Sequence, residues 1–249
     1  MHNVTRPMMR NGWWVLILAL LLLNIPRAYA KVYLVSVGIA DYPGRENDLY
    51  FSAEDAKTIT WLYGRNPTAV VSRQLIDRQA TVSAIVSAME SVFSQAGAGD
   101  RVVFFFSGHG YEGGFAAYDG FLSYSRIRAA MRKGKARTKM IFADACYSGR
   151  IRTPKKDSSP LQAKDEGVML FLSSRSNEMS VESEGMKNGM FTAYLQKGLR
   201  GSADANRDRI ITAREIYNFV HEGVVKATGG KQHPVMWGKF PDNMAVMTW

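Results

Sequence analysis

Two continuous apolar runs constrain the fold of this chain more than any other feature of its sequence. The first extends from Arg101 to Ser107, and the second from Met140 to Ala143. Such runs are typical of strands that are buried on both faces of a parallel sheet. Strand-like and helix-like segments alternate along the rest of the chain. The sequence therefore predicts an α/β fold, with a mostly parallel sheet covered by helices on both faces.

Three other segments carry local expectations. Residues Ser52 to Arg65 predict a helix, and Ser52 and Asp55 have the spacing of a capping box at its start. The turn signals Gly113-Gly114 and Asp119-Gly120 indicate that Tyr111 to Leu122 form a hairpin or flap. Pro234 and Pro241 predict an irregular tail after the last helix, which we expect to end near residue 227.

The first 30 residues form a separate segment. Arg6 and Arg10 precede an apolar run from Trp13 to Leu23, and small residues follow at the end of the segment. This pattern predicts a secretory signal peptide (residues 1–30) cleaved after Ala30. The run is shorter than the ~20 residues that cross a bilayer, although an uncleaved anchor is the alternative. We expect an exported protein, periplasmic or secreted, with residues 31–249 as its mature domain and no stable membrane span.

The chain is basic, with a formal net charge of +10. Loss of the first 30 residues removes three arginines and no acids, which lowers this charge to +7. Much of the excess lies in residues 132–139 and 150–156, which we interpret as solvated faces. No nucleic-acid motif or glycine-rich phosphate loop accompanies them, so we expect neither nucleic acid nor a nucleotide as a partner.

Cys146 is the only cysteine of the chain and follows the second apolar run. It cannot form an intrachain disulfide, so it is either buried packing or a reactive thiol. His109 follows the first run, in the sequence Ser107-Gly108-His109-Gly110. The carboxyl ends of parallel strands meet at one edge of a sheet. We therefore predict a catalytic dyad in which the Cys146 thiolate is the nucleophile and His109 is the acid and base.

The glycines beside His109 suit this chemistry. Gly108 and Gly110 allow a tight backbone turn and keep the approach to the imidazole open. The backbone N–H groups of Gly110 and Cys146 are candidates for an oxyanion hole that stabilises a tetrahedral intermediate.

The segments Phe105–Gly110 and Asp144–Gly149 together resemble the histidine and cysteine motifs of caspase-like cysteine peptidases, specifically the bacterial metacaspase-like (orthocaspase) members. The likeness extends over nearly all of residues 31–249 and includes Gly189–Leu195 and Gln232–Pro234. Tyr147 departs from it, since many metacaspases have a second histidine there. The resemblance implies a caspase-type three-layer sandwich with a six-stranded sheet, and peptide-bond hydrolysis by Cys146 and His109.

The same resemblance implies that Asp144, Asp55 and Ser107 form the pocket for the P1 side chain of the substrate. A carboxylate in a confined pocket favours a guanidinium or ammonium group and repels aspartate. We therefore expect protein or peptide substrates that are cleaved after Arg or Lys. Asp55 has a second interpretation, because it also fits the third residue of a capped helix.

The polar loop from Arg150 to Pro160 follows the nucleophile and is rich in basic residues. One interpretation is that the loop is an exposed connector without a function of its own. Its Arg and Lys residues also match the expected P1 preference, so self-processing is the sharper hypothesis.

Residues 204–215 have the spacing of a calcium-binding loop of the EF-hand type, with oxygen-bearing side chains at Asp204, Asn206, Asp208, Thr212 and Glu215. Arg209 stands where the sharp turn requires glycine, and its positive charge opposes a cation. The alternative is a capping box of Thr212 and Glu215. We expect the chemistry to need no cofactor. Calcium stays open as an activator, because many metacaspases require it.

The sequence thus favours an exported cysteine endopeptidase. One alternative is a caspase-fold interaction or scaffold protein whose dyad is vestigial, and another is a secreted thiol hydrolase that acts on esters or non-peptide amides. Reaction of Cys146 with a peptidyl-Arg electrophile would separate an active enzyme from a scaffold.

Overall fold

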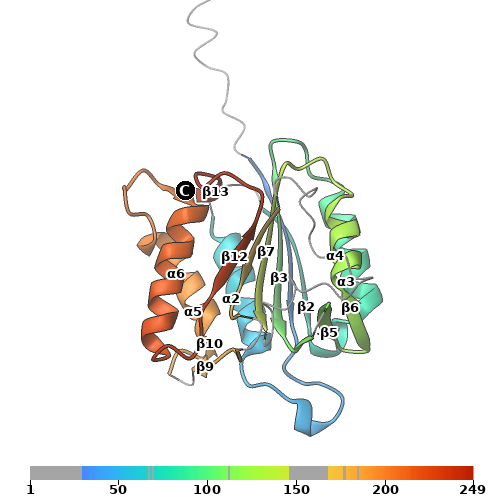
Figure 1. The fold of residues 1–249 in the computed structure, drawn as a ribbon. Coiled ribbons are helices and arrows are strands. Elements are labelled where there is room, and N and C mark those ends of the chain that lie inside the picture. The colour runs from blue at the N-terminus through green and yellow to red at the C-terminus, as the bar shows by residue number, and fades with distance from the viewer. Residues whose placement is uncertain are drawn as a thin grey trace, which may run out of the picture.

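A six-stranded sheet forms the centre of the computed structural model, which describes residues 30–66, 68, 70–111, 113–145, 168–175, 178–183 and 185–248. The strand order is β12-β8-β7-β3-β1-β2, and all neighbours are parallel except β12 and β8 (Figure 1). The strands are β1 (Val32–Gly38), β2 (Val70–Ile76), β3 (Arg101–Gly108), β7 (Thr138–Ala145), β8 (Val168–Leu172) and β12 (Val235–Gly238). The expected mostly parallel sheet is confirmed.

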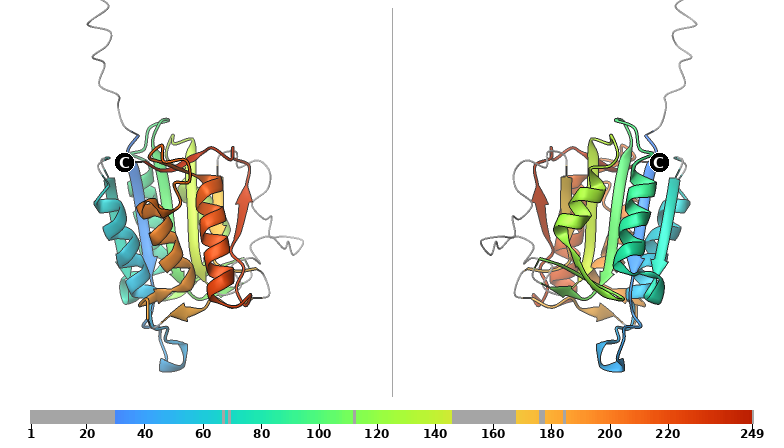
Figure 2. Two further views of the ribbon diagram at one scale, coloured as in Figure 1. Left: turned by 90° about the vertical axis from the view of Figure 1, so that its left-hand side faces the viewer. Right: turned by 90° about the vertical axis from the view of Figure 1, so that its right-hand side faces the viewer.

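Helices cover both faces of this sheet (Figures 1 and 2). One face packs against α2 (Ser52–Gly64), α5 (Met190–Lys197) and α6 (Ala213–Ala227), and the other against α3 (Val82–Phe93) and α4 (Tyr124–Met131). Successive side chains of a strand point to opposite faces. Phe105 accordingly belongs to the core on the α2 side, while Phe104 and Phe106 belong to the core on the α3 side. The apolar runs are continuous because each strand supplies both cores.

At α3, α4 and α6, the residue directly before the helix caps its first turn. The hydroxyls of Thr81, Ser123 and Thr212 each accept a hydrogen bond from a backbone N–H in the first turn of the helix that follows. The expected capping box of Ser52 and Asp55 is wrong. Phe51 precedes α2, and the Glu182 carboxylate accepts the N–H groups of Tyr50 and Phe51.

The expected hairpin after His109 is present as a small antiparallel sheet of β4 (Gly110–Tyr111), β5 (Gly114–Ala117) and β6 (Gly120–Ser123). The prediction of an irregular tail after the last helix is wrong. Strand β12 pairs with β8, and β13 (Ala245–Thr248) pairs with β11 (Ile210–Thr212). Both tail strands are four residues long. Such short segments contain too few alternating side chains to be recognised as strands from the sequence alone.

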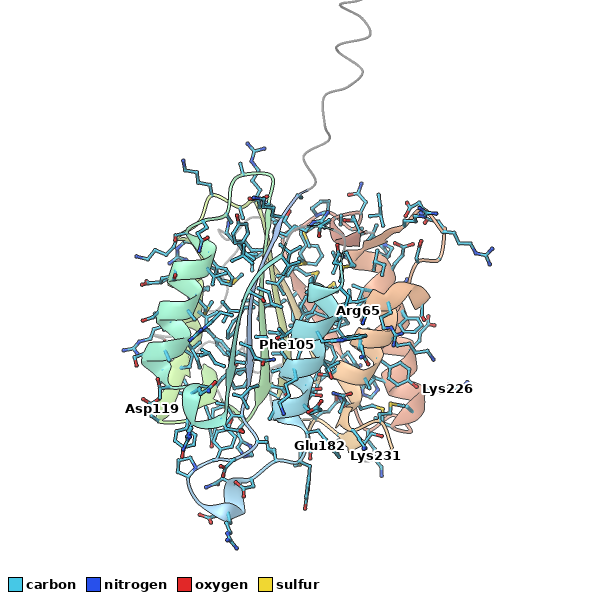
Figure 3. The ribbon with its side chains drawn as sticks, turned by 180° about the vertical axis from the view of Figure 1, so that it is seen from behind. Arg65, Phe105, Asp119, Glu182, Lys226 and Lys231 are labelled. Atoms are coloured by element: carbon cyan, nitrogen blue, oxygen red, sulfur yellow. The ribbon has the colours of Figure 1, made fainter. Side chains whose placement is uncertain are left out.

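Two short strands, β9 (Glu182–Ser183) and β10 (Asn188–Gly189), precede α5 and lie below α2 in Figure 1. Figure 3 places Glu182 beside the start of α2, near the carboxyl edge of the sheet. Within the described ranges, no helix has both the length and the apolar character needed to cross a membrane.

Candidate active site

The pairing of β3 with β7 brings the strand ends that precede His109 and Cys146 to one edge of the sheet. Ser107 lies opposite Asp144, and Gly108 lies opposite Ala145. His109 and Cys146 are the next residues in sequence after these pairs. Cys146 itself lies outside the described residues, as do the 150–160 loop and residues 1–29 of the predicted signal peptide. The predictions for these segments therefore stay predictions.

His109 is held on two sides. Its ring Nε2 lies 2.8 Å from the backbone oxygen of Asn47, and its backbone N–H donates to the Tyr42 hydroxyl at 3.0 Å. A carbonyl oxygen only accepts, so Nε2 must carry a proton in this contact. In the neutral imidazole, Nδ1 is then the nitrogen that can accept a proton. The contact fixes the tautomer that a general base needs.

Tyr42 is the main support of His109. Its ring centroid lies 4.8 Å from that of the imidazole, and its hydroxyl donates to the backbone oxygen of Ala116 at 3.1 Å. Burial raises the pKa of Tyr42 far above its usual value, so the hydroxyl stays protonated. A Cβ on Gly108 would lie 2.5 Å from this hydroxyl. Glycine at 108 therefore leaves the space that Tyr42 needs to reach His109.

The other half of the edge is a pair of buried carboxylates, Asp55 and Asp144, which are 1% and 5% exposed. Both face Gly189, where an added Cβ would clash with Asp144 Oδ2 and would lie 3.1 Å from Asp55 Oδ2. This is the pair that the sequence assigned to the P1 pocket. Ser107, the third expected member, donates to Asp55 Oδ2 at 2.8 Å.

Neutral donors hold each carboxylate. Asp55 Oδ1 accepts from the Asn188 side chain at 2.8 Å and from the Gly189 N–H at 3.0 Å. Asp144 Oδ2 accepts from the backbone N–H and the hydroxyl of Thr192, at 3.1 and 2.9 Å. Among the described residues, neither carboxylate has a cationic side chain as a partner.

Because both carboxyl groups are buried and have no described cationic partner, their charged forms are disfavoured and their pKa values rise. Burial raises the pKa of Asp144 to about 6, although the two hydrogen bonds from Thr192 act in the opposite direction. Burial, and then the charge of Asp144, hold the pKa of Asp55 well above its usual value. Two like charges that share a dry site resist simultaneous ionisation. Among the described residues, no cationic side chain offsets this repulsion.

Sequence reasoning missed Asn188, Thr192 and Glu182. The segment Gly189–Leu195 entered the family likeness, but no position in it was given a role. Glu182 acts on two parts of the site, because it binds the start of α2 and its charge raises the pKa of Asp144. Its separation of more than 130 residues from Phe51 leaves no local signal.

The carboxylates of the candidate calcium loop bind their own backbone. Asp204 accepts from the N–H groups of Asp208 and Arg209, and Glu215 forms the alternative capping box with Thr212. Arg209 adopts a φ of 67°, the left-handed conformation that disfavours a side chain. In the part of the chain that the structure describes, no three His, Cys, Asp or Glu residues group as metal ligands. Calcium activation stays a prediction.

The comparisons with known proteins agree with this geometry. The caspase-domain family model matches residues 32–244. A probable protease from a Desulfuromonadales bacterium is 26% identical over 240 residues, which cover 76% of this chain and 29% of that protein. The chain thus spans less than a third of that relative.

Two solved structures share the fold. A protein from Geobacter sulfurreducens has a TM-score of 0.65 at 16% identity, with 88% of this chain and 98% of that chain covered. Caspase-1 from Spodoptera frugiperda has a TM-score of 0.61 at 13% identity, with 88% and 89% covered. At these identities the likeness concerns the fold alone.

Proposed function

The chain belongs to the caspase-domain family, and on this premise we propose that it is an exported cysteine endopeptidase that cleaves peptide bonds after arginine or lysine. The family match and the probable-protease relative support the protease class. The observation that carries the reaction is the contact between His109 Nε2 and the Asn47 carbonyl, which leaves Nδ1 as the basic nitrogen.

In the proposed reaction, His109 accepts the thiol proton of Cys146, and the thiolate attacks the scissile carbonyl carbon. The tetrahedral intermediate collapses with cleavage of the C–N bond, and His109 returns the proton to the leaving amine. Water, deprotonated by His109, then hydrolyses the thioester. The N–H groups of Gly110 and Cys146 are proposed to stabilise the oxyanion in both halves.

The preference for arginine or lysine rests on Asp55 and Asp144. Both are buried, neither has a cationic partner in the part of the chain that the structure describes, and both face Gly189. An arriving guanidinium would supply the opposite charge and favour the ionised carboxylates. Glu182 adds a third acid whose field reaches Asp144. An aspartate at P1 would meet three carboxylates, so we propose that it is rejected.

Export is supported by the sequence pattern of residues 1–30. N-terminal sequencing of the protein purified from a cell fraction tests it, and we expect the mature chain to start at Lys31. A chain that retains residue 1 would point instead to an anchor.

Fluorogenic peptides with Arg, Lys, Asp or Asn at P1 test the reaction and its specificity together. We expect hydrolysis after Arg and Lys, and its loss in Cys146→Ala and His109→Ala. The matched control is Glu222→Gln, which alters an exposed carboxylate on α6 outside the candidate site and the candidate calcium loop. Cleavage after Asp would refute the specificity, and equal rates for wild type and Cys146→Ala would refute the mechanism in favour of a scaffold role.

A further inference from the structure

A hollow of about 440 Å³ lies on the α2 side of the sheet, away from the candidate active site. It lies between the C-terminal end of α2, the helical turn Gly198–Ser202 that follows α5, and strand β13. Its lining includes Trp61, Leu62, Arg65, Leu199, Arg200 and Met247. We call it the Trp61 hollow. Arg65 follows Asp55 by ten residues, a rise of about 15 Å along a helix, so the hollow is at the opposite end of α2 from the buried acids.

The Trp61 hollow combines apolar and cationic surfaces. Its buried apolar lining consists of Leu62, Leu199 and Met247. Trp61 is 48% exposed, and Arg65 and Arg200 are exposed as well. A ligand that covers the indole removes a large apolar surface from water. Hollows of this size hold a small ligand or a few side chains.

Two guanidinium groups lie against the Trp61 ring. The guanidinium carbon of Arg65 is 5.1 Å from the ring centroid, and that of Arg200 is 6.0 Å from it. Arg65 is four residues after Trp61, at the end of α2, and Figure 3 shows it on the side of the C-terminal helices. Arg200 comes from the turn after α5. Because a guanidinium that stacks on an aromatic ring keeps its N–H donors in its own plane, both arginines can still bind an acceptor.

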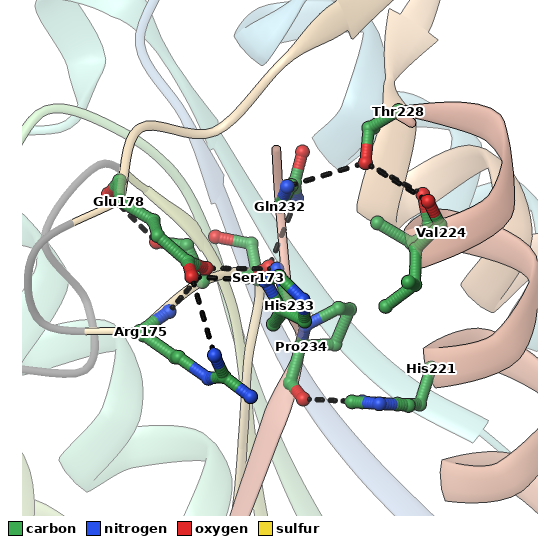
Figure 4. A network of polar contacts seen from close by, with 11 residues as sticks. Ser173, Arg175, Glu178, His221, Val224, Thr228, Gln232, His233 and Pro234 are labelled. Atoms are coloured by element: carbon green, nitrogen blue, oxygen red, sulfur yellow. Dashed lines mark hydrogen bonds and ion pairs between the residues drawn. The ribbon is translucent and has the colours of Figure 1, made fainter. Parts of the chain in front are cut away.

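No acid offsets these two charges over the ranges that the structure covers. The described ion pairs all involve other residues. Figure 4 shows the contrasting case of Arg175, whose guanidinium pairs with Glu178, a carboxylate that also contacts His233. The charges of Arg65 and Arg200 are therefore available to an anion from outside the described chain.

We propose that the Trp61 hollow binds an acidic segment of a partner protein. One carboxylate of that segment lies on the guanidinium groups of Arg65 and Arg200, and a neighbouring apolar side chain packs against Trp61. The inference goes beyond the proposed function, because it needs neither the thiol of Cys146 nor the acidic pocket.

A carboxylate beside an apolar group suits the hollow better than a free phosphate does. The planar fork of a guanidinium matches a carboxylate. Phosphate sites commonly use the N–H groups at the start of a helix, whereas α2 ends here and its last turn presents carbonyl oxygens. A free phosphate would also leave the indole uncovered.

Calorimetric titration of the purified chain with Cys146→Ala tests the site. The probe is the tetrapeptide Ala-Glu-Leu-Ala with an acetylated and an amidated end, so that it has one carboxylate. Binding should weaken about tenfold when Gln replaces the Glu of the peptide, because charge-assisted hydrogen bonds are lost. It should weaken severalfold when Ala replaces the Leu, because less apolar area is buried. Added NaCl should also weaken it, since both cations are exposed.

Substitutions of exposed side chains identify the residues that bind the peptide. Arg65→Gln and Arg200→Gln should each raise the Kd about tenfold, and Trp61→Leu should raise it severalfold. Arg65→Lys keeps the charge without the planar fork, so it should restore only part of the affinity. The matched control is Arg73→Gln, which removes an exposed positive charge from β2. The register partner of Arg73 is Val35, which belongs to the core on the other face of the sheet.

The outcomes separate this site from the proposed function. No binding at millimolar peptide, or a Kd that Arg65→Gln and Arg200→Gln leave where Arg73→Gln leaves it, would overturn the inference. Inorganic phosphate that binds as tightly as the peptide, with no effect of the leucine, would overturn the partner segment in favour of a simple anion. A protein that binds the peptide but cleaves no Arg-P1 substrate would refute the proposed function and support this inference. Cleavage without peptide binding would do the reverse.

Discussion

Replacement of Asp144 by asparagine should make the protein more stable at neutral pH while it weakens recognition of arginine. The asparagine side chain is nearly the same size, and its oxygen can still accept from Thr192. The folded protein raises the pKa of Asp144 from 3.8 to about 6. Above pH 6, this shift corresponds to a destabilisation of the folded state by about 3 kcal/mol.

The sign of the pH dependence follows from the same shift. Between pH 3.8 and about 6, the folded state binds the Asp144 proton more tightly than the unfolded chain does. The free energy of unfolding of the wild type therefore falls as pH rises through this window, and the penalty is complete above it. The Asp144→Asn variant has no such penalty. It should exceed the wild type by about 3 kcal/mol at pH 7.5 and should match it near pH 3.5.

Urea unfolding at a series of pH values, with Cys146→Ala in both proteins, measures this difference. Glu222→Gln, at an exposed position of α6, controls for the loss of one negative charge on a basic chain. The kcat/KM for an Arg-P1 peptide, measured with Cys146 intact, should fall about 100-fold or more in Asp144→Asn. If Asp144→Asn is equally stable or less stable than the wild type at pH 7.5, the ionised Asp144 does not destabilise the folded state, and the argument is refuted.

Three further predictions concern the dyad, the pocket and the loop after Cys146. Tyr42→Phe should lower kcat about tenfold and lower the free energy of unfolding by about 1 kcal/mol, because His109 loses the hydroxyl that accepts its N–H; unchanged kinetics would contradict this support. Gly189→Ala should abolish cleavage after Arg, since its methyl group would displace Asp144; retained activity would show that this side of the pocket is not used. Mass spectrometry of wild type and Cys146→Ala should show cleavage after basic residues of the 150–160 loop in the wild type alone, and identical masses would exclude self-processing.

The sequence predicted the parts of the site that follow from local patterns. The apolar runs before Ser107 and Asp144 predicted two buried strands, and their register brings these residues opposite each other. Helix starts at Thr81 and Thr212 followed the spacing of their own hydroxyl and backbone groups. In each case the partners lie within a few residues, or on strands whose burial is visible in the sequence.

The parts that escaped prediction depend on contacts between distant segments. Ser52 had suitable spacing for a cap, but Glu182 supplies the acceptors at the start of α2 from another element. Asn188 and Thr192 are common polar residues whose importance appears only when Asp55 and Asp144 are placed beside them. Strand β12 is short, and it becomes a strand because β8 presents an unpaired edge.

Under the proposed function, the buried acids should link the recognition of a basic side chain to the stability of the fold through the titration of Asp144. Protonation of Asp144 relieves the repulsion from Asp55 and Glu182, so it stabilises the unliganded fold, yet it removes the charge that a guanidinium needs. Lowering the pH toward about 6 should therefore increase the free energy of unfolding and weaken benzamidine binding together. If the same carboxylate causes both effects, the loss of stability should level off at the pH at which benzamidine binding reaches its full strength, because both limits are set by the pKa of Asp144 in the unliganded folded protein. Asp144→Asn should remove both pH dependences, and loss of only one of them would assign stability and recognition to different groups.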